Sequence, residues 1–271
     1  MGRILYKEKI ANYLNRDQKT EELGFDNSRL SYIPEYFSSY VEQERIPNFV
    51  CLVSRFGEVA HYSHQGFKNT ESQDEINNET IFRIYSMTKP ITSVAIMMLY
   101  ERGLIRLEHE LYRYLPEFKN TEAWDTGDIN NFKTKPLNNP ILIRDLLTHT
   151  AGFTYDFMLG HPAIGLYRKN GLHDYKNIET KEEMDLEEFC NKLSTLPLLF
   201  EPGEKWHYSC SIDILGRVVE VVSGMKLDAF FRENIFNPLE MLDTGFYVEK
   251  DKLDRFSDCY QTMLGSKKKN M

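Results

Sequence analysis

The chain has 271 residues, of which 41% are hydrophobic and 27% are charged, and its formal net charge is −8. These values are typical of a globular chain with a real core and argue against a fibre or a disordered protein. An acidic chain repels phosphate backbones, so we expect no nucleic-acid partner, and the basic run at 267–269 is interpreted as a short solvated tail.

The amino-terminal segment and the cysteines bear on the cellular compartment. The first residues contain no apolar stretch of signal-peptide length, and no segment is long and apolar enough to span a bilayer. We therefore expect a cytoplasmic protein without membrane association. Neither the four cysteines nor the seven histidines show the spacing of a disulfide framework or a metal site, so we expect free thiols, no metal and no cofactor.

A helix and a β-hairpin are the first predicted elements. Residues 27–42 carry apolar side chains at helical spacing, and Pro34 inside this segment predicts a kink or a late helix start. The next segment, FVCLVSRFGEVAHYSHQG, has two β-rich runs around the tetrapeptide RFGE, which predicts a hairpin turn at 55–58. We therefore expect a sheet region over about residues 25–85.

A helix with one buried face is predicted next, within FRIYSMTKPITSVAIMMLYERG. Because proline is tolerated only in the first turn of a helix, Pro90 requires this helix to begin close to Ser86. Gly103 suits its end. The expected buried positions recur at helical spacing and are Ile91, Val94, Ala95, Met98 and Leu99.

Four further helices are predicted in the segments ILIRDLLTHTAG, DLEEFCNKLSTLP, SIDILGRVVEVVSG and LDAFFRENIF. The first ends at Gly152, the second begins at an aspartate cap and stops before Pro197, the third ends at Gly224, and the fourth stops before Pro238. These segments define a helical region over about residues 86–239. The whole chain is interpreted as a single α+β domain.

Ser86 and Lys89 form a Ser-x-x-Lys pair, which on a helix places the hydroxyl and the amine one turn apart on one face. A serine hydroxyl needs a neighbour to take its proton, and a lysine can serve, while the helix amino terminus favours the oxyanion. The motif recurs at 223–226 and 266–269, so it is weak alone. Only Ser86 lies where an apolar β-like run meets a buried-face helix.

The stretch TIFRIYSMTKPITSVAIMMLYERG resembles the active-site helix of the serine β-lactamase and penicillin-binding-protein superfamily. It is most similar to the carboxylesterases and acyltransferases that have the class C β-lactamase fold. Four further stretches match in order: LLTHTAGFTYDF, FEPGEKWHYSCSIDILGRVVEVVSG, NPLEMLDTGF and KLDRFSDCYQ. The resemblance runs from about Leu23 to Gln261 and implies a β-lactamase/transpeptidase-like fold, with an antiparallel sheet region beside a helical region.

Residue by residue, the resemblance implies that Ser86 is the acylated nucleophile, that Lys89 holds and activates it, and that Tyr208 shares the base role and returns a proton to the leaving group. Lys89 and Tyr208 would titrate as a pair, so the proton is assigned to neither. The implied reaction is acyl transfer from a small-molecule carboxylic ester. No G-x-S-x-G elbow surrounds Ser86, so His149 is expected to cap a helix or brace a loop rather than join a triad.

The sequence departs from the family pattern at two places. Cys210 stands where β-lactamases and cell-wall peptidases have the asparagine of Tyr-x-Asn; a thiol lacks the donor and acceptor of an amide, which favours esters, and nothing indicates a reactive thiolate. The family's third motif, Lys-Thr-Gly or His-x-Gly on a late strand, is absent before the chain ends at GSKKKNM. We therefore expect a C-terminally truncated chain whose hairpin has an open apolar edge.

Two alternative functions stay open at this point. The first is a β-lactamase or D,D-peptidase. The second is a non-catalytic scaffold that keeps the fold but not the chemistry, which the missing third motif favours. A homo-oligomer is compatible with the sequence, which decides neither the oligomeric state nor the natural acyl group and acceptor.

Overall fold

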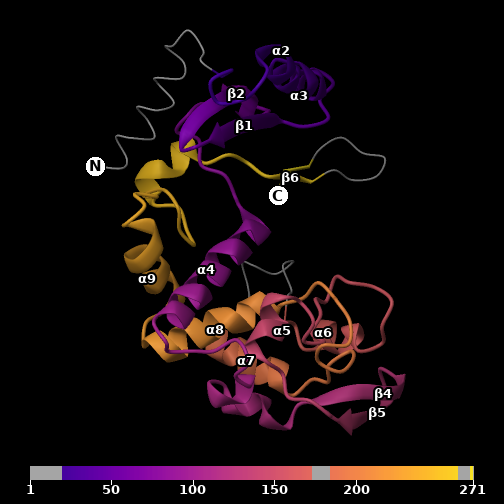
Figure 1. The fold of residues 1–271 in the computed structure, drawn as a ribbon. Helices are drawn as coiled ribbons and strands as arrows, with labels where there is room; N and C mark the ends of the chain where they lie inside the picture. Colours follow the sequence, from indigo (N-terminus) through magenta and orange to yellow (C-terminus); the bar gives the residue numbers. More distant parts are fainter. Residues whose placement is uncertain (1–19, 173–183, 262–268, 271) are drawn as a thin grey trace. The chain divides into compact units, whose positions relative to one another are not determined.

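A computed structural model describes residues 20–172, 184–261 and 269–270. The chain divides into two compact units, drawn in Figure 1. The first unit is formed by two separate stretches, Met1–Tyr85 and Phe236–Met271, whereas the second is the continuous stretch Ser86–Ile235. Both units contain helices and antiparallel strands, which gives the α+β class expected from the sequence.

The first unit contains a three-stranded antiparallel sheet in the order β1-β2-β3. Its strands are β1 (Asn48–Arg55), β2 (Glu58–Asn69) and β3 (Asp74–Glu75). Phe56 and Gly57 connect β1 to β2 with φ angles of 54° and 76°, the left-handed backbone that a two-residue hairpin turn requires. The predicted hairpin turn is therefore confirmed.

Two helices precede the sheet, α2 (Asn27–Leu30) and α3 (Tyr32–Glu42). Asp26 caps α2, because its carboxylate accepts hydrogen bonds from backbone N–H groups of the first turn. The helical pattern is interrupted at Ser31, and Pro34 lies in the first turn of α3, where its missing N–H leaves no helical hydrogen bond unmade. The late start predicted from this proline is confirmed.

The last stretch of chain joins the first unit through the turn η6 (Lys250–Arg255), β6 (Tyr260–Gln261) and β7 (Lys269–Asn270). The guanidinium of Arg255 pairs with the Asp243 carboxylate at 2.6 Å. Beyond this point, Ser266 of the third Ser-x-x-Lys motif and most of the basic tail lie outside the described residues.

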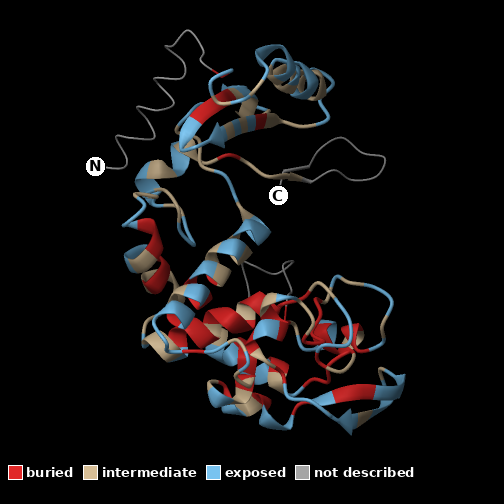
Figure 2. Cartoon of the chain, viewed as in Figure 1, coloured by how far each residue is buried: buried red, intermediate tan, exposed pale blue. Residues whose placement is uncertain are grey.

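Helix α8 (Ser211–Ser223) is the centre of the second unit and is buried along most of its length (Figure 2). It packs against α4 (Thr88–Glu101), α5 (Ile143–Leu147), α7 (Leu186–Ser194) and α9 (Leu227–Phe231). No helix in the described ranges has both the length and the hydropathy needed to cross a bilayer. The remaining helical turns are η1 (Tyr85–Met87), η2 (Leu111–Arg113), η3 (Pro116–Asn120), α6 (Ile164–Lys169) and the π-helical η5 (Arg232–Phe236).

Gly216 lets two of these helices approach α8 closely. A Cβ atom at this position would lie 2.9 Å from the Leu227 side chain and 3.3 Å from that of Leu186. These residues are the first of α9 and α7. Any larger side chain at position 216 would therefore push both helices away from the core.

Helix α4 begins directly after η1, so its predicted start close to Ser86 is confirmed. Its predicted buried face is confirmed at Ala95 and Leu99 and is wrong at Val94, while Ile91 and Met98 are half-buried. Ile96 is fully buried, whereas Val94 is 50% exposed. This helix is apolar on nearly every side, so periodicity alone selects no face, and the contact with α8 selects it instead. The buried residues of α4 are Thr92, Ala95, Ile96 and Leu99.

A β-hairpin lies inside the region predicted to be helical. Its strands are β4 (Glu122–Asp128) and β5 (Asn131–Pro136). The carboxylate of Asp128 closes the turn by accepting hydrogen bonds from the backbone N–H groups of Asn130, at 2.8 Å, and Asn131, at 3.1 Å. Trp124 stacks on Phe132 with ring centres 4.9 Å apart. The strands are too polar to show apolar alternation, which is why periodicity did not reveal them.

Candidate active site

Ser86 and Lys89 lie where the chain enters α4, and their side chains touch. Lys89 Nζ donates a hydrogen bond to Ser86 Oγ at 3.2 Å. Ser86 is exposed and Lys89 is half-buried. The preceding residue, Tyr85, has a φ of 41°, a left-handed conformation that costs a non-glycine residue about 1–3 kcal/mol and that commonly occurs at functional sites. The sequence spacing therefore does place the hydroxyl and the amine together.

Tyr208 reaches the same point from the loop before α8. Its Oη lies 2.6 Å from Ser86 Oγ, although the two residues are 122 positions apart in the sequence. Two backbone hydrogen bonds tie this loop to the segment after α5, from Gly203 N–H to the Thr150 carbonyl at 2.9 Å and from His207 N–H to the His149 carbonyl at 2.8 Å. The structure thus brings all three residues singled out from the sequence into one cluster.

The Lys89 cation dominates the electrostatics of this cluster. Burial raises the pKa of the Tyr208 phenol, but the hydrogen bonds with Lys89 and Ser86 and the charge of Lys89 outweigh it, so the pKa lies below its ordinary value. Lys89 Nζ lies 4.8 Å from the centre of the Tyr208 ring and 5.3 Å from that of Tyr155. A phenol with a lowered pKa is a better proton acceptor near neutral pH.

Sequence reasoning missed two residues beside the cluster, Tyr155 and Asp213. The Tyr155 hydroxyl donates to Asp213 Oδ2 at 3.2 Å, and the Tyr155 ring centre lies 5.5 Å from that of Tyr208. Burial, followed by the neighbouring Asp213 charge, raises the pKa of Tyr155, so this phenol keeps its proton. The available signals were the tyrosine within LLTHTAGFTYDF and the aspartate five residues after Tyr208.

Asp213 places a carboxyl group near Lys89. Burial raises the pKa of Asp213, while the charge of Lys89 and the hydrogen bond from Tyr155 act in the opposite direction. A backbone hydrogen bond at Asp213 also favours the carboxylate form. Asp213 thus links the first turn of α8 electrostatically to Lys89 of α4.

His149 braces the loop that carries Tyr208. Its Nδ1 lies 3.2 Å from Ser209 Oγ, and its ring centre is 5.0 Å from that of Tyr208. Burial lowers the pKa of His149, and the nearby charges of Lys89 and His207 lower it further, so the imidazole is neutral at pH 7. Its φ of 57° is again left-handed. These contacts agree with the bracing role expected from the sequence and not with a Ser-His-Asp triad.

Cys210 lies at the N-cap of α8, next to Ser209, and is fully buried. Burial raises the pKa of its thiol well above the ordinary value, which keeps the sulfur protonated. A protonated, inaccessible thiol is a poor nucleophile. Among the described residues, no group of three histidine, cysteine or acidic side chains is arranged to hold a metal ion.

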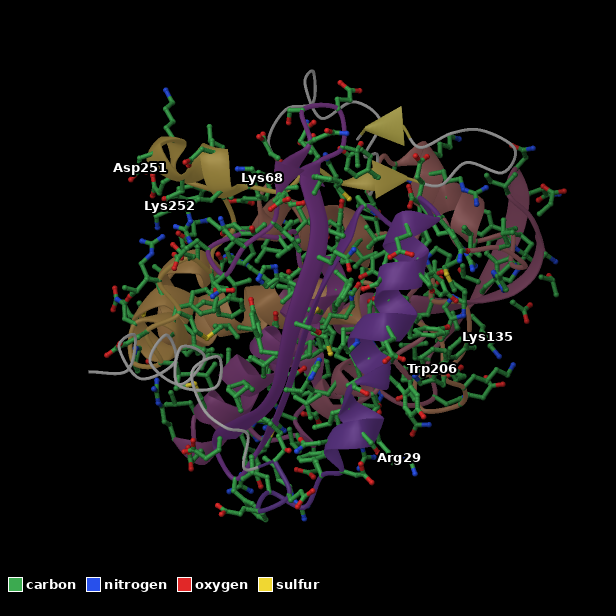
Figure 3. All side chains as sticks on the ribbon, turned by 90° about the horizontal axis from the view of Figure 1, so that it is seen from above. Arg29, Lys68, Lys135, Trp206, Asp251 and Lys252 are labelled. Carbon is green, nitrogen blue, oxygen red and sulfur yellow. The ribbon has the colours of Figure 1, made fainter. Side chains whose placement is uncertain are left out.

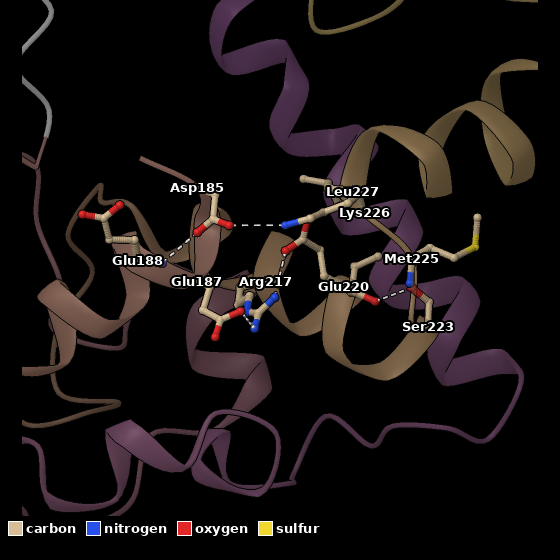
Figure 4. Close-up of polar contacts among 10 residues, drawn as sticks. Asp185, Glu187, Glu188, Arg217, Glu220, Ser223, Met225, Lys226 and Leu227 are labelled. Atoms are coloured by element: carbon tan, nitrogen blue, oxygen red, sulfur yellow. Dashed lines mark hydrogen bonds and ion pairs between the residues drawn. The ribbon is translucent and has the colours of Figure 1, made fainter. Parts of the chain in front are cut away.

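The second Ser-x-x-Lys pair is engaged elsewhere, at the far end of α8 (Figure 4). Ser223 Oγ donates to the Val219 carbonyl at 2.6 Å, and Lys226 pairs with the Asp185 carboxylate at 3.3 Å. Asp185 also caps α7, as the sequence predicted. A serine bonded back to its own helix and a lysine bonded to a carboxylate lack the mutual contact that Ser86 and Lys89 make.

Comparison with known proteins gives a consistent set of relatives. The model of the family described as Beta-lactamase matches residues 33–270. The chain is 34% identical over 210 residues to Esterase EstB of Burkholderia gladioli, which covers 78% of this chain and 50% of EstB. It is 34% identical over 203 residues to Lovastatin esterase of Penicillium rubens, which covers 73% of this chain and 48% of that protein.

The solved structure of EstCE1, described as a hydrolase with promiscuous acyltransferase activity, matches with a TM-score of 0.75 and 29% identity. The match covers 93% of this chain and 60% of EstCE1. The chain spans about half the length of the curated relatives it matches.

Proposed function

This chain belongs to the Beta-lactamase family, and from that premise we propose that it is a serine hydrolase or acyltransferase acting on carboxylic esters, with Ser86 as the nucleophile. The observation that carries the proposal is the contact of Ser86 Oγ with Tyr208 Oη at 2.6 Å and with Lys89 Nζ at 3.2 Å. A base and a cation next to an exposed hydroxyl are what nucleophilic catalysis by serine requires. Two relatives named as esterases support the choice of an ester substrate.

In the proposed acylation step, Ser86 Oγ attacks the ester carbonyl carbon while Tyr208 Oη takes the hydroxyl proton. The carbonyl oxygen becomes an oxyanion, and the positive end of α4 together with the Lys89 cation favours this negative charge. The tetrahedral intermediate then breaks its bond to the alkoxide. Tyr208 returns the proton to that leaving group, so an alcohol departs and an acyl group stays on Ser86.

Deacylation repeats the same proton transfers with a second nucleophile. The oxygen of water or of an acceptor alcohol attacks the acyl carbon, and Tyr208 takes the proton that this oxygen loses. The proton passes to Ser86 Oγ as the acyl–oxygen bond breaks, which regenerates the free serine. Water gives hydrolysis, whereas an alcohol gives acyl transfer, and both outcomes use the same three residues.

Cys210 favours esters over β-lactams as substrates. It occupies the position after Tyr208-Ser209 where a β-lactamase has an amide side chain, and it is fully buried. A site without that amide has no donor and acceptor to offer to the amide group of a β-lactam substrate. The ester reading therefore takes precedence over the β-lactamase or D,D-peptidase alternative.

The test compares Ser86 and Ser223, each of which begins its own Ser-x-x-Lys motif. We expect the chain to hydrolyse p-nitrophenyl acetate, and Ser86→Ala to lower kcat/KM by at least ~1,000-fold, because the nucleophile is removed. Ser223→Ala serves as the matched control and should retain wild-type turnover, since its hydroxyl bonds to its own helix.

Three outcomes would contradict the proposal. Equal activity of Ser86→Ala and the wild type would remove Ser86 from the reaction. Faster turnover of nitrocefin than of the p-nitrophenyl ester would favour a β-lactamase. A folded, monodisperse protein that hydrolyses neither substrate would favour the non-catalytic scaffold.

A further inference from the structure

Five side-chain rings form a continuous row through the candidate active site, with Tyr208 at its centre. On one side the ring centre of His149 lies 5.0 Å from that of Tyr208, and the ring centre of Trp206 lies 6.3 Å beyond it. On the other side Tyr155 lies 5.5 Å from Tyr208, and Phe157 stacks on Tyr155 at 4.9 Å with the ring planes 16° apart. All four centre-to-centre distances lie in the range that aromatic pairs prefer.

The two ends of this row are exposed, whereas the three rings between them are buried or half-buried. Tyr155 is 5% exposed, whereas Phe157 is 56% exposed and Trp206, labelled in Figure 3, is 67% exposed. The other tryptophan of the chain, Trp124, is only 8% exposed because it is packed on Phe132. An exposed tryptophan and phenylalanine beside a reactive centre are large apolar surfaces that a bound molecule could cover.

The chemistry of the row indicates an uncharged ligand. Neither end residue carries a charge, since Phe157 is a hydrocarbon ring and Trp206 is an indole with a single N–H donor. The imidazole of His149 is neutral at pH 7 because burial lowers its pKa. The centre of the row holds the polar cluster of Ser86 and Tyr208, with the two oxygens 2.6 Å apart. A ligand that spans the row therefore needs a polar, reactive group in its middle and apolar groups on both sides.

We propose that Trp206 and Phe157 form two apolar subsites on either side of the reacting carbonyl, one for the acyl chain and the other for the alcohol part of the ester. This inference rests on the proposed function and specifies its substrate class: esters with apolar substituents on both the acid and the alcohol. His149 and Tyr155 act as spacers that set the distance of each subsite from Tyr208.

The experiment varies one half of the ester at a time. p-Nitrophenyl acetate and octanoate differ in the acyl chain, whereas methyl acetate and octyl acetate differ in the alcohol. We expect one of Trp206→Ala and Phe157→Ala to lower kcat/KM about 10-fold for the long acyl chain, and the other to do so for the long alcohol, because a truncated apolar subsite loses discrimination of this size. Trp206→Phe and Phe157→Leu, which keep apolar side chains, should recover most of the loss.

Matched comparisons separate a subsite from a general defect. In each alanine variant the ratio of kcat/KM for the long ester to that for the short ester should fall in one of the two series, and the ratio in the other series should stay at the wild-type value. Tyr247→Ala removes an aromatic side chain that is 64% exposed in the other unit, and it should leave all four substrates unaffected. Equal losses on short and long esters would overturn the subsite assignment, and so would losses by both variants on the acyl series alone.

A binding measurement does not depend on turnover. Addition of 2-octanone, an unreactive apolar ketone, should shift the wild-type tryptophan emission to the blue as Trp206 becomes buried, and Trp206→Phe should abolish the shift because Trp124 is already buried. If esters are not hydrolysed but the shift occurs, the proposed function fails and the apolar site stands. If esters are hydrolysed and no shift occurs, the apolar site fails alone.

Discussion

A cation lies at each end of helix α8, and the two cations are held in opposite ways. At its carboxy-terminal half, the Arg217 guanidinium contacts Glu187 at 2.5 Å and Glu220 at 3.1 Å, and Glu220 also accepts the Leu227 N–H at 3.0 Å (Figure 4). At the amino-terminal end, the direct contacts of the Lys89 cation are the Ser86 hydroxyl and two tyrosine rings, and the Asp213 carboxyl group acts on it only through its charge.

Under the proposed function, one end of this helix contributes to stability and the other end contributes to the reaction. The Arg217 cation is half-buried and is matched by two carboxylates, and its removal leaves the buried Glu220 carboxylate uncompensated. A cation whose direct contacts are a hydroxyl and two rings can still stabilise the negative charge that develops during a reaction. The Lys89 cation helps to lower the pKa of Tyr208, as expected for a cation that is held in the second way.

Of the changes that distinguish the two cations, Lys89→Met is expected to have the largest effect. Removal of the cation should lower kcat/KM for p-nitrophenyl acetate by about 10⁴-fold, at the upper end of what acid–base and charge stabilisation provide. The thermal midpoint should stay close to that of the wild type, because methionine fills the same space. Lys226→Met, the lysine of the second motif, is the control and should retain activity; a comparable loss there would contradict the distinction.

The opposite pattern is expected from Arg217→Met at the other end. This change leaves Glu220, which is 8% exposed, without its cation, so the free energy of unfolding should fall by about 3–5 kcal/mol. Urea denaturation measures the fall. The kcat/KM of the folded fraction should change by less than about twofold. A strong loss of activity without a loss of stability would contradict the assignment of Arg217 to stability.

A smaller effect concerns the titration of one tyrosine among 16. Because its pKa lies below the ordinary value of a tyrosine, Tyr208 should ionise at a lower pH than a free tyrosine does, and kcat/KM should rise with pH as it loses its proton. The phenolate absorbance of the wild type minus that of Tyr208→Phe isolates this group. In a Lys89→Met background the same difference titration should move to higher pH. An unchanged midpoint would show that Lys89 does not set the proton affinity of Tyr208.

The smallest effect is expected at the end of α8, from Gly224→Ala. Gly224 ends the helix with a φ of 71°, and a side chain there is strained, so the loss of stability should be about 1 kcal/mol. Gly224→Asn should lose less, because asparagine tolerates the left-handed conformation. Activity should be unchanged in both. Denaturant midpoints measure the difference, and equal midpoints for alanine and glycine would contradict it.

Features that depend on local chemistry were predictable from the sequence. The start of α4 near Ser86 followed from Pro90, the start of α7 from the Asp185 cap, and the turn after β1 from its glycine. Features that depend on packing were not. The buried face of α4 is chosen by contact with α8, and the polar strands β4 and β5 are held by cross-strand pairing rather than by an apolar pattern.

In the candidate site, too, local geometry was predictable from the sequence and contacts made by packing were not. The spacing of Ser86 and Lys89 predicts their contact, since helical geometry fixes it. The involvement of Tyr208 came from the family resemblance, because no local rule connects residues 122 positions apart. Tyr155 and Asp213 were missed because their hydrogen bond forms only when the loop after α5 packs on α8.

The most direct test of the central claim is covalent labelling with a p-nitrophenyl phosphonate, followed by peptide mapping. We expect one adduct, located on the peptide that contains Ser86, with labelling absent in Ser86→Ala and unchanged in Ser223→Ala. An adduct on another residue, or equal labelling of Ser86→Ala and the wild type, would contradict it.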